Sequence, residues 1–187
     1  GRVGLCTQEF GGLGAWLVYA LDLVLGQLDE PGGMMFTSPA VDLEPLTRSI
    51  GFEIGFDRYR SRVRGLPEFG GELPVVTLAE EIDTPGQGQV RALVCSAGNP
   101  VLSTPNGGRL DRALATLDFM VAIDPYINET TRHAHVILPP TSALEHSHYD
   151  IGLATLAVRN VAKYSPPVFP RAPDQRHDAE ICLELWS

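Results

Sequence analysis

The sequence predicts an α/β fold built on a parallel sheet, and two observations support this prediction. Near-continuous apolar segments occupy residues 90–96, 118–124 and 135–139, and a helical apolar pattern at 107–117 separates the first two. Strands that are apolar at nearly every position are typical of parallel sheets, whose faces are both covered. Parallel neighbours also need a crossover connection, which the intervening helix supplies. We therefore expect helices on both faces of this sheet.

A helix is expected at residues 12–25, ahead of the sheet. Apolar side chains recur there at three- and four-residue spacings, and Gly26 is a typical C-terminal stop. The apolar stretch is interrupted by Gly14 and Asp22 and is too short to span a bilayer. The helical pattern is carried by Leu13, Trp16, Leu17, Ala20, Leu21, Val24 and Leu25.

Residues 34–74 show no sustained period, so we expect a long irregular excursion within the domain. Excursions of that length usually serve function or are covered by another domain. The segment carries four alternating arginines, which predict a solvated charged stretch or, alternatively, a surface that steers an anion. These are Arg58, Arg60, Arg62 and Arg64. A short helix at 77–83 and the turn "TPGQGQ" then lead to the first strand of the sheet.

Polar residues stand where two of the predicted strands end. Gly98-Asn99-Pro100 follows the first strand, and Asp124 ends the second. Ligands of open α/β sheets bind at the carboxyl ends of the strands, so these residues are candidate neighbours in a binding site. Asn99 offers a donor and an acceptor, and Gly98 permits close backbone approach. The alternatives are an Asx turn at Asn99 and an N-cap at Asp124.

The histidines and cysteines give weaker signals. His133, His135, His146 and His148 form two His-x-His pairs, but loop histidines near a ligand are favoured over a metal site, which needs converging ligands. Three widely spaced cysteines favour a reducing compartment, the cytoplasm, over a disulfide framework. Cys95 lies within an apolar strand and is expected in the core, and Cys6 is expected to be structural.

Composition excludes several classes of protein. The chain has 187 residues, 44% of them hydrophobic and 20% charged, which fits one globular domain. The net charge of −9 argues against nonspecific binding of nucleic acid. A P-loop, a GxGxxG fingerprint and a nucleophile elbow are all missing from the sequence. The sequence begins "GRVG" without Met, so we expect a piece of a longer protein. Because the catalytic motifs are missing, we expect this piece to bind a ligand and to catalyse nothing unaided.

Three segments together resemble the molybdopterin oxidoreductase family, also called the dimethyl sulfoxide reductase superfamily. They are "GLCTQEFGGLGAWLVYALDLVLGQLDEPGGMMF", "RALVCSAGNPVLSTPNG" and "DFMVAIDPYINETTRHAHVILPPTSALEHSHYD". The resemblance covers the chain apart from residues 37–74 and is greatest for the formate dehydrogenase and nitrate reductase branches. It implies a single three-layer, Rossmann- or flavodoxin-like domain over residues 1–187, one part of a larger catalytic subunit.

The resemblance also implies a cofactor and the residues that contact it. The family binds molybdenum or tungsten through molybdopterin guanine dinucleotide, and seven positions here match cofactor contacts. Gln8 matches a loop near the pterin, and Ile123 with Asp124 matches the pair that faces the guanosine. His146 stands where relatives place a basic side chain, and its charge would depend on pH. The remaining matches are Gly98, Asn99 and Asp178.

Other parts of the active enzyme are expected outside this segment. The resemblance implies an iron–sulfur cluster and the residue that ligates molybdenum in sequence preceding Gly1, so Cys6 is not assigned as that ligand. Relatives have Asp at the position of His135, so no role is carried over there. Partners are expected to be the remaining domains and electron-transfer subunits, without membrane insertion, and the isolated chain is expected to be inactive and to self-associate. The alternative is a scaffold relative without molybdenum, such as the large iron–sulfur subunit of NADH dehydrogenase.

Overall fold

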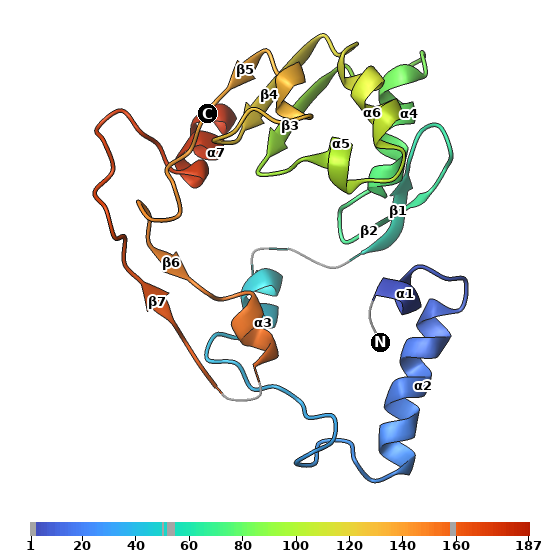
Figure 1. The fold of residues 1–187 in the computed structure, drawn as a ribbon. Helices are drawn as coiled ribbons and strands as arrows, with labels where there is room; N and C mark the ends of the chain where they lie inside the picture. Colours follow the sequence, from blue (N-terminus) through green and yellow to red (C-terminus); the bar gives the residue numbers. More distant parts are fainter. Residues whose placement is uncertain (1–2, 50, 52–54, 158–159) are drawn as a thin grey trace. The chain divides into compact units, whose positions relative to one another are not determined.

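A computed structural model describes residues 3–49, 51, 55–157 and 160–187 (Figure 1). The chain divides into two compact units. The first comprises residues 1–46 and 149–164, and the second comprises residues 47–148 and 165–187. The second unit contains the predicted sheet, so it positions most of the candidate site residues.

The first unit begins with two helices, α1 (Val3–Cys6) and α2 (Gly11–Val24). Helix α2 confirms the helix predicted from the apolar spacing. Gly26, at φ 67°, ends it as expected. Its N–H donates to the carbonyl of Leu23, and the N–H of Gln27 donates to that of Asp22, which is the Schellman arrangement. No helix in the described ranges is long and apolar enough to cross a membrane.

The remaining elements near the first unit are short. They are α3 (Leu43–Ser49), the 3-10 turn η3 (Leu153–Leu156), and the strands β6 (His148–Tyr149) and β7 (Tyr164–Ser165). Strands β6 and β7 pair as a two-stranded sheet. The single domain expected over residues 1–187 stays a prediction.

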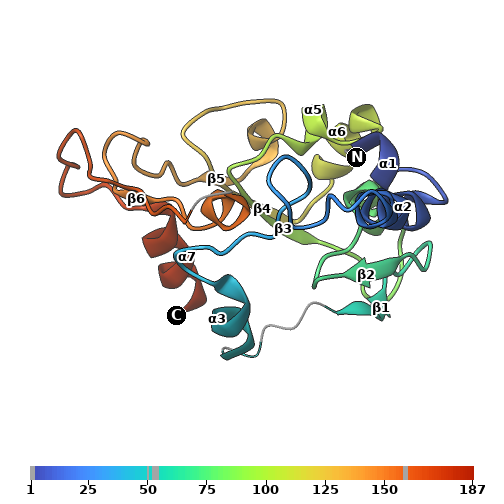
Figure 2. The ribbon, with the colours of Figure 1, turned by 90° about the horizontal axis from the view of Figure 1, so that it is seen from below.

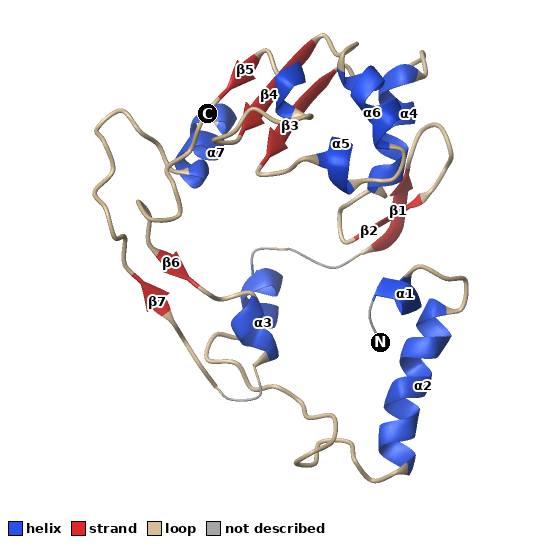
Figure 3. Cartoon of the chain, viewed as in Figure 1, coloured by secondary structure: helices blue, strands red, loops and turns tan. Residues whose placement is uncertain are grey.

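The second unit contains a parallel sheet in the order β3-β4-β5 (Figure 3). The strands are β3 (Ala92–Ser96), β4 (Phe119–Ile123) and β5 (Val136–Ile137), each inside a segment predicted as a strand. Pairing runs from Ala92 opposite Phe119 to Ser96 opposite Ile123. The carboxyl ends of β3 and β4 therefore lie at one edge, which confirms the α/β fold and the expected juxtaposition.

One face of the sheet packs against helices α4 (Leu78–Asp83) and α6 (Gly107–Leu114). Helix α4 follows the 3-10 turn η1 (Val75–Thr77), and these two elements include the helix expected at 77–83. Leu93 and Cys95 of β3 point to this face, and Met120 of β4 is fully buried within it. The core cluster of this face comprises Ala79, Ile82, Leu110, Ala113, Leu114, Leu117 and Met120.

A short helix that the sequence did not reveal, α5 (Pro100–Ser103), precedes α6. The two helices approach closely at Gly107. A Cβ atom on Gly107 would lie 1.9 Å from the carbonyl oxygen of Val101, so only glycine fits there. The α5–α6 turn therefore depends on this one position.

Helix α7 (Asp178–Trp186) lies on the other face, near β5 (Figure 2). Leu138, just after β5, is on the same face as Val121 because side chains alternate along a strand. Ile181 of α7 is buried and shares a cavity lining with Leu138. Val94 of β3 is on this face too, but it is 59% exposed. Helices were expected to cover both faces of the sheet. This is wrong for β3, because α7 packs next to β5 and leaves the Val94 face of β3 exposed.

Residues 34–74 were expected to be irregular, but the described part of this range contains regular elements. These are α3 and an antiparallel pair of strands, β1 (Phe56–Arg60) and β2 (Pro67–Phe69). Each of the four arginines forms an ion pair, and the side chains of Arg58, Arg60 and Arg64 are about half exposed, which agrees with the predicted solvated stretch. The alternative of an anion-steering surface stays a prediction. The ion pairs are Arg58–Glu68, Arg60–Asp57, Arg62–Glu81 and Arg64–Glu80.

Candidate cofactor-binding site

The end of β3 turns sharply into the loop that was expected to contact a ligand. Ala97 adopts a left-handed backbone at φ 51°, and its N–H donates to the carbonyl of Ile123 at 2.9 Å. Gly98, by contrast, is not in the left-handed region, and a Cβ there would meet only ordinary contacts at 3.7 Å and 3.8 Å. The described part of the chain itself therefore does not require glycine at 98.

Asn99 uses its side chain to join this loop to residues 128–131. Its Nδ2 donates to Glu129 Oε2 at 2.7 Å, and its Oδ1 accepts from Thr130 Oγ1 at 2.7 Å. The hydrogen bond from Asn99 holds the pKa of Glu129 below its ordinary value. The Asx turn considered as an alternative is therefore not formed with the described residues.

Asp124 lies at the end of β4 with its side chain buried. Its Oδ1 accepts from the N–H of Tyr126 at 2.8 Å, and its Oδ2 accepts from Asn128 Nδ2 at 3.5 Å. The first bond forms an Asx turn, not the helix N-cap considered as the alternative. Within the described ranges, no arginine or lysine forms an ion pair with this carboxylate.

A chain of hydrogen bonds connects Asn99 with Asp124. Asn128 Oδ1 accepts from the N–H groups of Thr130 and Thr131, both at 2.9 Å, while its Nδ2 reaches Asp124. The hydroxyl of Thr130 then reaches Asn99. The loops that follow β3 and β4 are thus held as one network, and the 3-10 turn η2 (Thr131–His133) continues from it.

A cavity of about 550 Å³ opens directly after Asp124. His146 and Asp178, two predicted site residues, line it together with Pro125 and Tyr126. A cavity of this size is typical of sites for small molecules and cofactors. The other lining residues are Pro140, Thr141, Ser142, Ala143, Glu145 and Gln175.

His177 connects Thr141 and His146, two residues that line this cavity. Its Nδ1 is 2.7 Å from Thr141 Oγ1, and its ring meets that of His146 edge to face at 5.9 Å between centroids. The backbone N–H of His177 donates to Glu180, whose pKa is lowered to about 2, chiefly by Arg171. Asp178 therefore lies at the first turn of a capped helix, facing the loop that carries His146.

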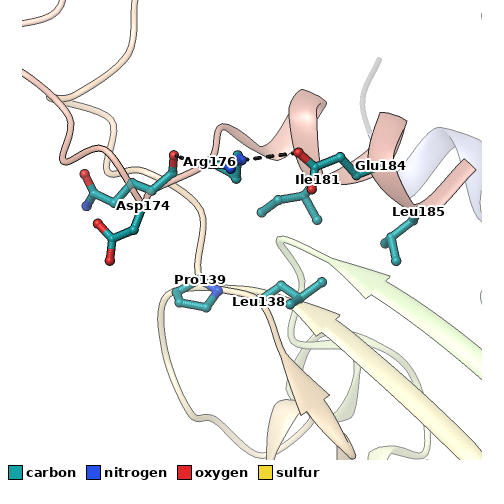
Figure 4. Close-up of a pocket in the computed structure, with 8 residues that line it drawn as sticks. Leu138, Pro139, Asp174, Arg176, Ile181, Glu184 and Leu185 are labelled. Carbon is teal, nitrogen blue, oxygen red and sulfur yellow. Dashed lines mark hydrogen bonds and ion pairs between the residues drawn. The ribbon is translucent and has the colours of Figure 1, made fainter. Parts of the chain in front are cut away.

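A second cavity, of about 490 Å³, lies on the other side of Gln175 (Figure 4). Its floor is apolar, formed by Leu138, Ile181 and Leu185, and its rim carries the Arg176–Glu184 ion pair at 3.2 Å. None of the residues predicted to contact a cofactor lines it. The first cavity is therefore the better candidate for the cofactor.

Two predicted site residues have other surroundings. Ile123 is buried, so its side chain belongs to the sheet, and its carbonyl holds Ala97. Gln8 is exposed between α1 and α2 in the first unit, whereas the other six positions belong to the second unit. The structure brings together Gly98, Asn99 and Asp124 at the strand ends, and His146 and Asp178 in the cavity beside them.

His133 and His135 have local partners. His133 Nε2 lies 2.6 Å from Asp111 Oδ1, and His135 Nδ1 accepts from the N–H of Met120 at 3.1 Å. Only His146 among the four lines the 550 Å³ cavity. In the described residues, no group of three or more histidine, cysteine or acidic side chains is arranged to hold a metal ion.

The cysteines are free. Cys95 packs on the core cluster as predicted, and burial, with the nearby charge of Asp124, raises the pKa of its thiol. Cys6 and Cys182 are exposed. Cys6 is therefore outside the core of the described residues, and the structural role expected for it stays a prediction.

Comparison with known proteins identifies the family. The sequence profile of the molybdopterin oxidoreductase family matches residues 9–187. The chain belongs to the molybdopterin oxidoreductase family. This confirms the resemblance carried by the three sequence segments, including the last one around Asp124.

Three curated relatives illustrate the similarity. The assimilatory nitrate reductase catalytic subunit of Bacillus subtilis is 40% identical over 117 residues, 60% of this chain. The NADPH-Fe(3+) oxidoreductase subunit alpha of Geobacter sulfurreducens is 32% identical over 122 residues, 64% of the chain. The F420-dependent formate dehydrogenase subunit alpha of Methanocaldococcus jannaschii is 36% identical over 64 residues, 34% of the chain. The aligned parts span 15%, 14% and 9% of these relatives.

Sequence reasoning missed the residues that organise the site. Asn128, Thr130, Thr131 and His177 position the predicted residues but were given no role. The available signal was the run Asn-Glu-Thr-Thr, in which four consecutive side chains can form hydrogen bonds, close behind an acidic residue at a strand end. Such a run in a short loop indicates that side-chain hydrogen bonds connect the loop to neighbouring loops.

Proposed function

We propose that this chain is part of the catalytic subunit of a molybdopterin-dependent oxidoreductase and helps to bind molybdopterin guanine dinucleotide. The observation that carries the proposal is the network from Asn99 to Asp124 at the carboxyl ends of β3 and β4, beside a cavity lined by His146 and Asp178. Parallel α/β sheets bind their ligands at this edge.

The chemistry of these residues fits such a cofactor. In the described chain, the second N–H of Asn99 has no assigned partner, and Gly98 leaves room for close approach of a ligand. The carboxylate of Asp124 accepts one bond on each oxygen and can accept more, as the N–H edge of a guanine would require. His146 and Asp178 add a side chain that can carry positive charge and one that carries negative charge.

In this proposal the cofactor and the protein residues have different roles. When bound, the cofactor's molybdenum or tungsten supplies two-electron redox chemistry, while protein residues supply binding and orientation. Asn99 and Asp124 orient the nucleotide end, and His146 and Asp178 form the wall of the cavity. Gln8 contributes near the pterin. The chemistry of the parent is closest to that of nitrate reductases or formate dehydrogenases.

Further parts of the parent belong to the same proposal. An iron–sulfur cluster and electron-transfer subunits complete the enzyme, in keeping with relatives that are named as subunits. The sparse, unpaired cysteines favour the cytoplasm. The charge of −9 makes nucleic acid an unfavourable partner.

Substitution of Asp124 in the full-length parent subunit tests the proposal. Loss of hydrogen bonds to a charged group lowers affinity roughly tenfold or more, so Asp124→Ala should strongly reduce molybdenum or tungsten and guanine dinucleotide per purified subunit. Asp118→Ala is the control. Asp118 directly precedes β4, whereas Asp124 directly follows it, and Asp118 is exposed. Metal analysis and nucleotide release measure both variants.

The outcomes separate the two functional hypotheses. Full cofactor content and activity in Asp124→Ala would show that the site is misassigned. Absence of molybdenum and tungsten from the unmodified parent, expressed in a host that makes the cofactor, would favour the scaffold alternative. Equal losses in Asp124→Ala and Asp118→Ala would point to a general folding defect and would also count against the assignment.

A further inference from the structure

We propose that Thr130 is a positioning residue that fixes the orientation of the Asn99 side-chain amide for cofactor binding. The inference rests on the proposed function, in which Asn99 contacts the cofactor. Thr130 is completely buried, although it carries a hydroxyl and follows an exposed loop residue, Glu129. A buried hydroxyl needs partners, and those of Thr130 identify its role.

The hydroxyl of Thr130 has a defined polarity. Its oxygen accepts the N–H of Val101 at 3.0 Å, so its single proton is available for Asn99 Oδ1 at 2.7 Å. Glu129 accepts from Asn99 Nδ2 at 2.7 Å on the other side. Because a carboxylate only accepts, both neighbours select the same orientation of the amide. A flipped amide would place its oxygen against the charge of Glu129.

This arrangement prepares the amide before a ligand arrives. With Oδ1 and one N–H already engaged, Asn99 keeps its second N–H for a ligand and does not have to choose a rotamer on binding. Preorganisation of this kind increases affinity by removing an ordering cost. Asn128 extends the arrangement, because its Oδ1 holds the N–H of Thr130 while its Nδ2 reaches Asp124.

Thr131 provides a matched control within the same loop. It is also completely buried, and its hydroxyl likewise accepts one N–H, from Asn128 at 2.8 Å, and donates to one oxygen, that of Tyr126 at 2.9 Å. Among the described residues, its hydrogen bonds are with Asn128 and Tyr126 and none is with Asn99. Replacing either threonine with valine therefore removes the same hydroxyl and leaves one backbone N–H without its acceptor, but only Thr130→Val removes a hydrogen bond to the Asn99 amide.

The test is a double-mutant cycle in the full-length parent enzyme. The measured quantity is the fraction of cofactor retained after dilution, in wild type, Thr130→Val, Asn99→Ala and the double variant. Loss of one hydrogen bond predicts a roughly five- to tenfold fall in retention for Thr130→Val. Thr130→Ser should restore retention to within about twofold. In the Asn99→Ala background, Thr130→Val should have no further effect, whereas Thr131→Val should be independent of Asn99.

Each outcome has a distinct meaning. If Thr130→Val lowers retention equally with and without Asn99, Thr130 acts through folding and the inference is overturned. If Asn99→Ala retains the cofactor fully, the assigned role of Asn99 in the proposed function fails instead. Glu129→Ala keeps the inference testable if Thr130→Val does not fold, because Glu129 is exposed. Glu129→Ala should lower cofactor retention less than Thr130→Val does, and this loss should disappear in the Asn99→Ala background. A loss that persists there would contradict the inference.

Discussion

The β1–β2 hairpin and the β3–β4–β5 sheet belong to the same compact unit but are stabilised by different interactions. The sheet is held by apolar packing, with Met120 fully buried beneath α4 and α6. The hairpin is held by ion pairs, and its Glu68 carboxylate is completely buried against Arg58. A periodic apolar pattern is visible in a sequence, whereas a pairing between distant charges is not.

The largest expected effect concerns the sheet and its connections. Gly107→Ala should reduce the free energy of unfolding of the 187-residue chain by about 3 kcal/mol, because the new Cβ would overlap the Val101 carbonyl. Urea unfolding followed by circular dichroism measures this change. Gly98→Ala is the control, with an expected change below about 0.5 kcal/mol, since its Cβ would meet only ordinary contacts. Similar losses in the two variants would refute the difference drawn between these glycines.

A smaller, pH-dependent effect is expected in the hairpin. Hydrogen bonding to Arg58 lowers the pKa of Glu68 from 4.5 to about 2. Because the folded pKa is depressed, this carboxylate stabilises the fold above pH 4.5, and the contribution is lost as the pH falls toward 2. Glu68→Gln should therefore unfold at lower urea than wild type at pH 7, and the difference should shrink between pH 5 and pH 2.

Glu180→Gln is the comparison for that experiment. Its pKa is also lowered to about 2, chiefly by Arg171, but its side chain is 37% exposed and its partner 39%. Solvent screens such a pair, so the shift in urea midpoint should follow the same pH range with a smaller amplitude. A difference for Glu68→Gln that stays constant from pH 7 to pH 2 would show that its charge does not stabilise the hairpin.

The smallest effect is expected at the start of the sheet. Arg91 and Asp118 form an ion pair at 2.6 Å with side chains that are 69% and 56% exposed. Exposed pairs contribute little, so Arg91→Ala should leave the urea midpoint unchanged within error at both low and high salt. A clear, salt-sensitive loss would mean that electrostatic pairs stabilise the sheet as well as the hairpin.

The parts of the fold that were predicted from sequence share a local cause. Helix α2, its Gly26 terminus and the strands of the sheet follow from periodicity and turn chemistry within a short window. The hairpin could not be predicted in this way, because Glu80 and Glu81 pair with arginines more than fifteen residues earlier. Cover of β3 was overestimated because an apolar strand pattern does not reveal which helix packs on it.

The site was predictable to the same extent. Asn99 and Asp124 could be placed together because parallel strands end at one edge of a sheet. Their hydrogen-bond partners could not, since the bond between Thr130 and Asn99 joins residues from two loops. The contacts of His177 with Thr141 and His146 depend on the return of the chain at α7, which no local pattern in residues 165–177 predicted.

That return has a consequence for the order in which the protein is made. The second unit is discontinuous, with residues 149–164 belonging to the other unit. A ribosome therefore releases the sheet and the loop carrying His146 before Gln175, His177 and Asp178 have been synthesised. Because Gln175 and Asp178 are the last lining residues to emerge, the nascent chain completes this cavity only once the start of α7 has been synthesised.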